Sequence, residues 1–311
     1  MLHNNTTVGC VDYNSSLFTG YFTCFGAVAL TLNLITTKVV RGCEIYTSST
    51  KCLMISQCLL NGLQSLVYCG YLGPSLGFKR ETDFSQSPIP RLCVSVWILG
   101  STYGQLIIAV QRFSACYNSQ KAKTVFSWRN TLLMSVCSAV VALVVAVLCS
   151  FVRGNGYISV CNFMWTRSKP NAELNALVNR ILITNRAICV ICVAVSYIAV
   201  AVLIRGKVKS GSQGLKAEHK VTLQMALLVT IRFAHMILNG QLVQKAKVTF
   251  DRQISIGAVD TSKLFIIFAD PIVYLWGTRE NLSAILSPVN FWKRQKTVIV
   301  SPAVWAAPPK A

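Results

Sequence analysis

The stretch Thr131–Val152 reads TLLMSVCSAVVALVVAVLCSFV and contains no charged residue over 22 positions. As an α-helix with a rise of ~1.5 Å per residue, it covers about 33 Å, slightly more than the ~30 Å hydrocarbon core of a bilayer. The 311-residue chain is 53% hydrophobic and 13% charged, whereas soluble domains carry about 25% charged residues. This stretch therefore predicts a membrane-spanning helix.

Six further apolar stretches of similar length flank this one. The seven predicted spans are Leu17–Val40, Cys52–Leu72, Leu92–Val110, Thr131–Val152, Ile181–Ile204, Val221–Leu242 and Ile254–Trp276. The second and sixth spans contain several polar residues, which a bilayer tolerates when neighbouring helices cover them. We therefore predict an all-α membrane protein, a seven-transmembrane helix bundle over residues 17–277, with an outer tail over 1–16 and an inner tail over 278–311.

The positive charges indicate how the chain is oriented. With the N-terminus outside, the inner loops and tail hold 17 Lys and Arg residues, and the outer loops hold 10. Such a bias is typical of cytoplasmic loops. A net charge of +20 could also suggest nucleic acid, but basic cytoplasmic loops account for it, so no nucleic-acid partner is expected.

The outer tail agrees with this orientation. It contains glycosylation sequons at Asn4, Asn5 and Asn14, and such sites are used on the lumenal side. Two of the 13 cysteines, Cys93 and Cys161, are also predicted to lie on the outer, oxidising side. We expect a disulfide between them, and two free thiols are the alternative.

The inner end of the third span carries Gln111-Arg112-Phe113. Arg112 lies 19 residues after Cys93. That separation is about 28 Å of helix, roughly one bilayer. An arginine at this depth can bond to neighbouring helices in a closed bundle and to carbonyl groups of an inserted partner in an open one. Alternatively it is a cation that extends to the interface.

The seventh span ends in Asp270-Pro271-Ile272-Val273-Tyr274. Proline kinks a helix, and an acid at membrane depth needs a polar partner or a proton. Asn33, Gln57 and Asn61 in the first two spans are candidate partners for Asp270. A kinked helix with a buried polar cluster can rearrange between two states, although a chance kink is the simpler interpretation.

These motifs, in this order, resemble rhodopsin-type G-protein-coupled receptors, and more narrowly the nematode serpentine chemoreceptors of class x. The resemblance covers about residues 17–290. It rests on Asn33, on Ile55-Ser56-Gln57 with Asn61, on Ala109–Phe113, on Phe126–Thr131, and on Asp270-Pro271 with Tyr274-Leu275.

The resemblance implies a role for each motif. Gln111, Arg112 and Phe113 would contact the G protein, Asp270, Pro271 and Tyr274 would form the activation motif, and Asn33, Gln57 and Asn61 would form the polar core. It also implies a sensory-neuron plasma membrane and an environmental ligand. A short amphipathic helix is expected after the seventh span.

The chain departs from the family pattern in several places. The acid usual before the motif arginine is Gln111, the second span has no Asp, and the fifth and sixth spans have no proline. The arginine therefore lacks its usual ionic restraint, which puts ordinary coupling in doubt.

Ionisable residues in the outer halves of the last three spans suggest the ligand. They are Arg186, Arg232, His235, Asp260 and Lys263. Asp260 can neutralise one cation, which leaves excess positive charge at a depth where charge is costly. We therefore expect a small ligand with an acid group, held by Arg232 or Lys263. Alternatively, these groups extend outward or pair with one another.

Enzyme signatures are missing from the sequence. The three histidines are scattered, and no phosphate-binding or nucleophile motif is present, so neither an enzyme nor a cofactor or metal site is expected. The sequence thus favours a receptor that binds a small molecule and activates a heterotrimeric G protein. A small transporter or ligand-gated channel is the alternative, but an odd number of spans without an internal repeat argues against it.

Overall fold

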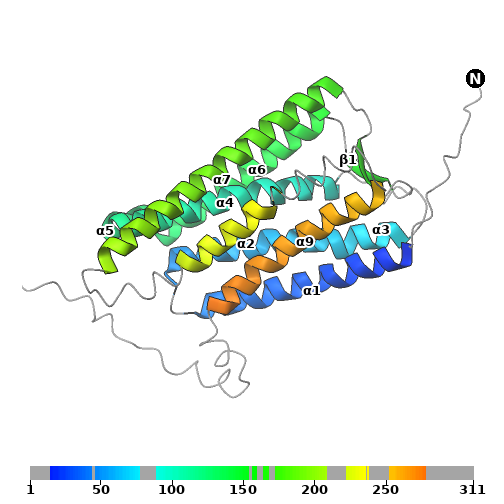
Figure 1. Ribbon diagram of the computed structural model, residues 1–311. Helices are drawn as coiled ribbons and strands as arrows, with labels where there is room; N and C mark the ends of the chain where they lie inside the picture. The colour runs from blue at the N-terminus through cyan, green and yellow to red at the C-terminus, as the bar shows by residue number, and fades with distance from the viewer. Residues whose placement is uncertain are drawn as a thin grey trace, which may run out of the picture.

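The computed structural model of the chain describes residues 15–43, 46–77, 89–153, 156–159, 164–167, 172–208, 222–235, 237 and 252–277. Over these ranges seven long helical segments lie along one another as a bundle (Figure 1). They are α1 (Ser15–Gly42), α2 (Ser48–Val67), α4 (Ile89–Tyr117), α6 (Trp128–Arg153), α7 (Ala172–Val208), residues 222–235, and α9 (Arg252–Gly277).

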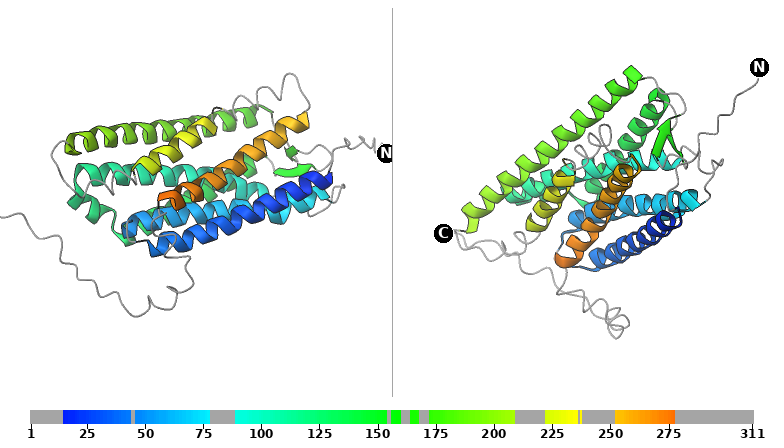
Figure 2. Two further views of the ribbon diagram at one scale, coloured as in Figure 1. Left: turned by 60° about the horizontal axis from the view of Figure 1, so that its bottom comes forward. Right: turned by 45° about the vertical axis from the view of Figure 1, so that its right-hand side comes forward.

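Five of the described helices are long and apolar enough to cross a membrane: α1, α2 with its continuation to Gly77, α4, α6 and α7. The helix at 222–235 and α9 are not among these five, and Figure 2 shows the former (yellow) between α7 and α9. Phe151, Leu133 and Ile198 on α6 and α7 are more than half exposed. In a bilayer these apolar faces contact lipid, so their exposure costs nothing.

The interior of the bundle forms around α2 and α4. α4 contacts α2, α6 and α7, while α1 packs against α2 and α9. One buried cluster towards the inner ends of the helices includes Met54, Ile108, Met225 and Tyr274. A second cluster includes Phe22, Tyr68, Trp97 and Ile267. Two apolar layers thus enclose the polar groups described below.

The second membrane helix is less regular than its sequence predicts. It begins at the N-cap Thr47, passes into a π-helix at Tyr68–Leu72 and continues as α3 (Gly73–Gly77). The Gly73 amide donates to the Tyr68 carbonyl, five residues back, as a π-helix requires. A Cβ at Gly26 of α1 would lie 2.7 Å from the Cys69 nitrogen. Glycine therefore allows α1 to approach this π-helix closely.

Two short features were not predicted from the sequence. α5 (Ser119–Val125) follows α4 after Asn118, whose side chain accepts from the Lys121 amide at 3.0 Å. β1 (Gly156–Ser159) and β2 (Met164–Arg167) pair antiparallel, with Gly156 opposite Arg167. β1 contacts α4 and lies at the end of the bundle where α9 begins (Figure 1). The protein is therefore almost entirely, but not wholly, helical.

Candidate functional site

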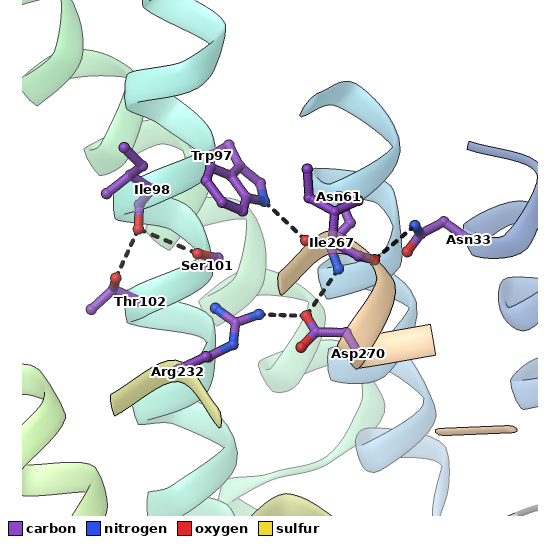
Figure 3. A network of polar contacts seen from close by, with 9 residues as sticks. All are labelled: Asn33, Asn61, Trp97, Ile98, Ser101, Thr102, Arg232, Ile267 and Asp270. Carbon is purple, nitrogen blue, oxygen red and sulfur yellow. Dashed lines mark hydrogen bonds and ion pairs between the residues drawn. The ribbon is translucent and has the colours of Figure 1, made fainter. Parts of the chain in front are cut away.

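Asp270 of α9 is the centre of a buried polar network (Figure 3). Its side chain is 0% exposed and forms an ion pair with Arg232 from the helix at 222–235. Asn61 of α2 donates through Nδ2 to Asp270 Oδ2 at 2.9 Å, and its Oδ1 accepts from Trp97 Nε1 of α4 at 2.9 Å. One carboxylate thus connects four helices at membrane depth, where its charge needs such partners.

Asn33 of α1 has a different role from the one its position suggested. Its Nδ2 donates to the Ala29 carbonyl at 2.8 Å and to the Ile267 carbonyl of α9 at 3.3 Å. Ile267 lies four residues before Pro271, so the missing proline N–H leaves that carbonyl without its helical donor. Asn33 supplies a substitute donor and joins α1 to α9 one turn before Pro271.

Gln57 lies away from Asp270 and faces Gly104 of α4, where a Cβ would overlap its amide. Its Oε1 is buried without a hydrogen-bond partner among the described residues. The side chain borders a groove of about 310 Å³ between α2, α4 and α6. Of the three proposed partners of Asp270, therefore, only Asn61 contacts it directly.

A second cavity lies between α4, α7, the helix at 222–235 and α9. Three of the five proposed ligand contacts, Arg186, Arg232 and His235, line it. Lys263 does not line it, but lies within electrostatic reach of His235, as do Arg186 and Arg232. His235 Nε2 is 3.3 Å from Ser262 Oγ. The side chain of Asp260 lies outside the described residues, so its proposed role stays a prediction.

Arg232 reaches further along α9 than helix spacing suggested. By its distance along the sixth span Arg232 would lie level with Lys263 of the seventh, but its acid partner is Asp270, seven residues nearer the inner end. The long arginine side chain and the strong attraction between opposite charges in a low-dielectric interior account for the difference.

Gln105 is a cavity residue that the sequence analysis missed. It lines the same cavity, is 4% exposed, and neither of its amide atoms has a hydrogen-bond partner among the described residues. The spacing of Trp97, Ser101 and Gln105 at i, i+4 and i+8 places them on one helix face. That pattern could have revealed Gln105 as an inward-facing residue.

Side chains at the inner end of α4 donate hydrogen bonds to hydroxyl groups of α2. Gln111 Nε2 donates to Ser49 Oγ at 2.6 Å and to Thr50 Oγ1 at 3.3 Å. Arg112, which is 3% exposed, donates through Nη2 to the same Thr50 hydroxyl. We call Gln111, Arg112, Ser49 and Thr50 the inner latch. Phe113 instead points outward and stacks on Tyr117, with ring centroids 6.0 Å apart.

A second set of contacts closes the inner face between the last two described helices. Gln224 Nε2 donates to the Val273 carbonyl at 2.9 Å, and Gln224 Oε1 accepts from Tyr46 Oη at 3.2 Å. Burial raises the pKa of Tyr46 to about 12, so the phenol stays protonated and can donate. Tyr274 is fully buried beside this contact, in the core with Ile108 and Met225.

Several proposed sites lie outside the described residues. They are Cys161, the sequons at Asn4, Asn5 and Asn14, and the helix expected after the seventh span. Cys93 lies in the first turns of α4, and no disulfide forms among the cysteines that the structure describes. Its pairing with Cys161 therefore stays a prediction.

Comparison with known proteins gives a family and a fold. The model of the family described as serpentine type 7TM GPCR chemoreceptor Srx matches residues 22–244. The crystal structure of squid rhodopsin superposes with a TM-score of 0.69, covering 94% of each chain at 11% sequence identity, a likeness that concerns the fold alone. No curated protein matches the sequence. The predicted rhodopsin-like seven-helix fold is thus confirmed.

Proposed function

Because the chain belongs to the Srx family of serpentine seven-transmembrane chemoreceptors, we propose that it binds a small molecule in the cavity lined by Arg186 and Arg232 and activates a heterotrimeric G protein at its inner face. The family and fold are those of multi-pass membrane receptors. We further propose a location in the plasma membrane of a sensory neuron.

The Asp270 network is the observation that carries this proposal. Arg232 and Trp97 line the cavity, and both connect to Asp270 of α9, Arg232 directly and Trp97 through Asn61. The residue after Asp270 is Pro271, where the helix lacks a backbone bond. A ligand that moves Arg232 or Trp97 therefore changes the forces on α9 next to the position where its backbone hydrogen bonding is interrupted.

The inner latch supports the other half of the proposal. Arg112 is held against α2 by hydroxyl groups, without the adjacent acid that is usual in this superfamily. A hydrogen bond from the guanidinium to a neutral hydroxyl is weaker than its ion pair with a carboxylate. The latch can therefore open at a modest cost and release Arg112 towards a G protein, and the missing acid does not leave Arg112 unrestrained.

The charges around the cavity support a ligand with an acid group. Arg186, Arg232 and His235 line it, and Asp270 is the one acid in contact with these groups among the described residues. Since Asp270 neutralises Arg232, the cation left for a ligand in the cavity is Arg186.

Nucleotide exchange on purified receptor tests the function. The receptor is reconstituted in nanodiscs with heterotrimeric G proteins, and Arg112→Gln is expected to lower exchange while leaving surface expression unchanged. Arg129→Gln, an exposed arginine after α5, is the matched control. Unchanged exchange in Arg112→Gln contradicts the proposal. Substrate or ion flux through receptor-containing vesicles, without exchange, favours the transporter or channel alternative.

A further inference from the structure

We infer that the ligand is a compact organic acid with a second hydrogen-bonding group, such as a short-chain hydroxy or oxo acid, its carboxylate bound by Arg186 and its second group by Gln105. This inference rests on the proposed function, because it takes the cavity between α4 and α7 as the ligand site. It adds a ligand class and two residues with separate tasks.

Arg186 is a cavity-lining cation to which the described residues offer no acid. It lines the cavity from α7 and has no ion-pair partner among the residues that the structure describes. Its neighbour Asn185 donates to Tyr103 Oη at 3.0 Å, which fixes this turn of α7 against α4. An unpaired guanidinium at membrane depth is costly. A carboxylate offers it the two parallel hydrogen bonds that fit its planar fork.

Arg232 adds to the positive electrostatic potential in the cavity, while Arg186 binds the ligand carboxylate. Its Nη2 is bound to Asp270, whereas its Nε and Asp270 Oδ1 are both buried without hydrogen-bond partners among the described residues. Each of the two side chains therefore keeps one buried polar atom that a ligand could hydrogen-bond. Arg186 and Arg232 lie within electrostatic reach of one another, so an anion between them is attracted by both.

Gln105 points to the second group on the ligand. An amide buried with both its oxygen and its nitrogen unpaired is rare, because each such group loses its hydrogen bonds to water. Gln105 is in this state at the cavity wall. A hydroxyl group can both donate to the amide oxygen and accept from its nitrogen, and an oxo group can accept. An acid without such a group leaves Gln105 unpaired.

The cavity also limits the size of the ligand. Its volume is about 40 Å³, which holds roughly three waters, since each needs about 10–15 Å³. Most drug-sized ligands occupy cavities of about 300–1,000 Å³. The space therefore suits a compact acid rather than a long-chain or aromatic one.

The test measures binding to purified receptor in nanodiscs, without G protein. The probes are lactate, pyruvate and glycerate, compared with propanoate, which lacks the second group, and methyl lactate, which lacks the charge. At least one of the first three should bind more tightly than propanoate, and methyl lactate should not bind. Arg186→Gln should raise the dissociation constant of every acid by at least about tenfold. Arg180→Gln, an exposed arginine on the same helix, should leave it unchanged.

Gln105→Leu separates a ligand contact from a packing role. Removing an unpaired buried amide should leave the thermal stability of the empty receptor equal or higher. The same change should weaken the hydroxy and oxo acids about fivefold or more, and leave propanoate unchanged. A loss of stability in the empty receptor with unchanged acid affinity would overturn the role of Gln105.

The outcomes also separate this inference from the proposed function. If none of the acids binds, or if Arg186→Gln binds them as well as the wild type, the ligand class is wrong. If an unrelated neutral or cationic agonist drives nucleotide exchange and its response is unaffected by Arg186→Gln, the receptor function stands and the ligand class falls. If the acids bind as described but never promote nucleotide exchange, the inferred ligand class is supported and the proposed G-protein activation is wrong.

Discussion

Arg232 and Asp270 form an ion pair that joins the helix at 222–235 to α9, with side-chain exposures of 14% and 0%. The pair places opposite charges in contact in the membrane interior. Arg232 lines the candidate ligand cavity, and Asp270 directly precedes Pro271 of α9. Any change in this pair should therefore affect stability, ligand affinity and basal activity together.

The first prediction follows from removing the acid of this pair. Asp270→Asn leaves the charge of Arg232 buried without a counterion and should destabilise the receptor by about 3 kcal/mol. The double variant Asp270→Asn with Arg232→Gln should recover much of this loss, which thermal unfolding in nanodiscs can measure. Acidic ligands should stabilise the single variant more than the wild type. Equal stability of the single and double variants would show that the charge pair is not the cause.

The second prediction concerns the inner latch. Thr50→Val removes the hydroxyl that accepts from Gln111 and Arg112 but keeps the side-chain shape. Basal nucleotide exchange should rise several-fold, since a hydrogen bond from a charged group is worth about 1.5–3 kcal/mol. Ser56→Ala is the control, because the Ser56 hydroxyl donates to the Cys52 carbonyl of its own helix.

The opposite change at the latch should strengthen it. Gln111→Glu places a carboxylate beside Arg112 that can also accept from the Ser49 hydroxyl. Basal exchange should fall below that of the wild type, because a charge-assisted contact replaces a neutral one. Basal exchange that is equal or higher in this variant counts against the latch.

The third prediction concerns the close approach of α1 to the π-helix. A Cβ at Gly26 would lie 2.7 Å from the Cys69 nitrogen and 3.0 Å from the Tyr68 Cβ. Gly26→Ala should lower the free energy of unfolding by about 1–3 kcal/mol, because backbone must move. Gly20 on the same helix has nothing within 4 Å of its Cβ position, so Gly20→Ala should be neutral or slightly stabilising. Similar melting temperatures for the two variants would contradict this reading of α1.

The fourth prediction concerns the outer end of α4. Cys93→Ser and Cys161→Ser should each reduce surface expression, and the double variant should be no worse than either alone, because one disulfide is lost in all three. Cys24→Ser, an exposed cysteine on α1, is the control. Peptide mapping without reductant should find Cys93 and Cys161 joined. Two free thiols in surface-expressed receptor would exclude the bond.

The helices and the family could be recognised in the sequence because both depend on local properties. A membrane helix satisfies its backbone hydrogen bonds within one segment, so length and apolar composition are enough to indicate it. Arg112 and Asp270-Pro271 could be assigned to the ends of their spans for the same reason. The irregular part of the second span was not foreseen: the π-helix at Tyr68–Leu72 lies against Gly26 of α1, a contact between segments that the sequence of one span does not contain.

The partners of the polar residues could not be read from the sequence in the same way. Spacing gave Asn33, Gln57 and Asn61 similar depths, yet one contacts Asp270, one contacts the Ile267 carbonyl, and one faces Gly104. Gln57 and Asn61 lie one turn apart on the same face of α2, so their partners differ because α4 and α9 approach α2 at different turns. A depth estimate contains no information on which helix approaches at which turn.

By itself the sequence determined that the chain is a seven-helix membrane protein of the Srx receptor family, and it predicted a polar core and basic inner loops. Only the tertiary structure decided that Asp270 neutralises Arg232, that Asn33 replaces the donor lost at Pro271, and that Gln105 lines the cavity without a partner. The physical reason is that hydrophobicity acts along each segment, whereas hydrogen bonds and ion pairs act over a few ångströms between segments. Their geometry exists only once the helices have packed.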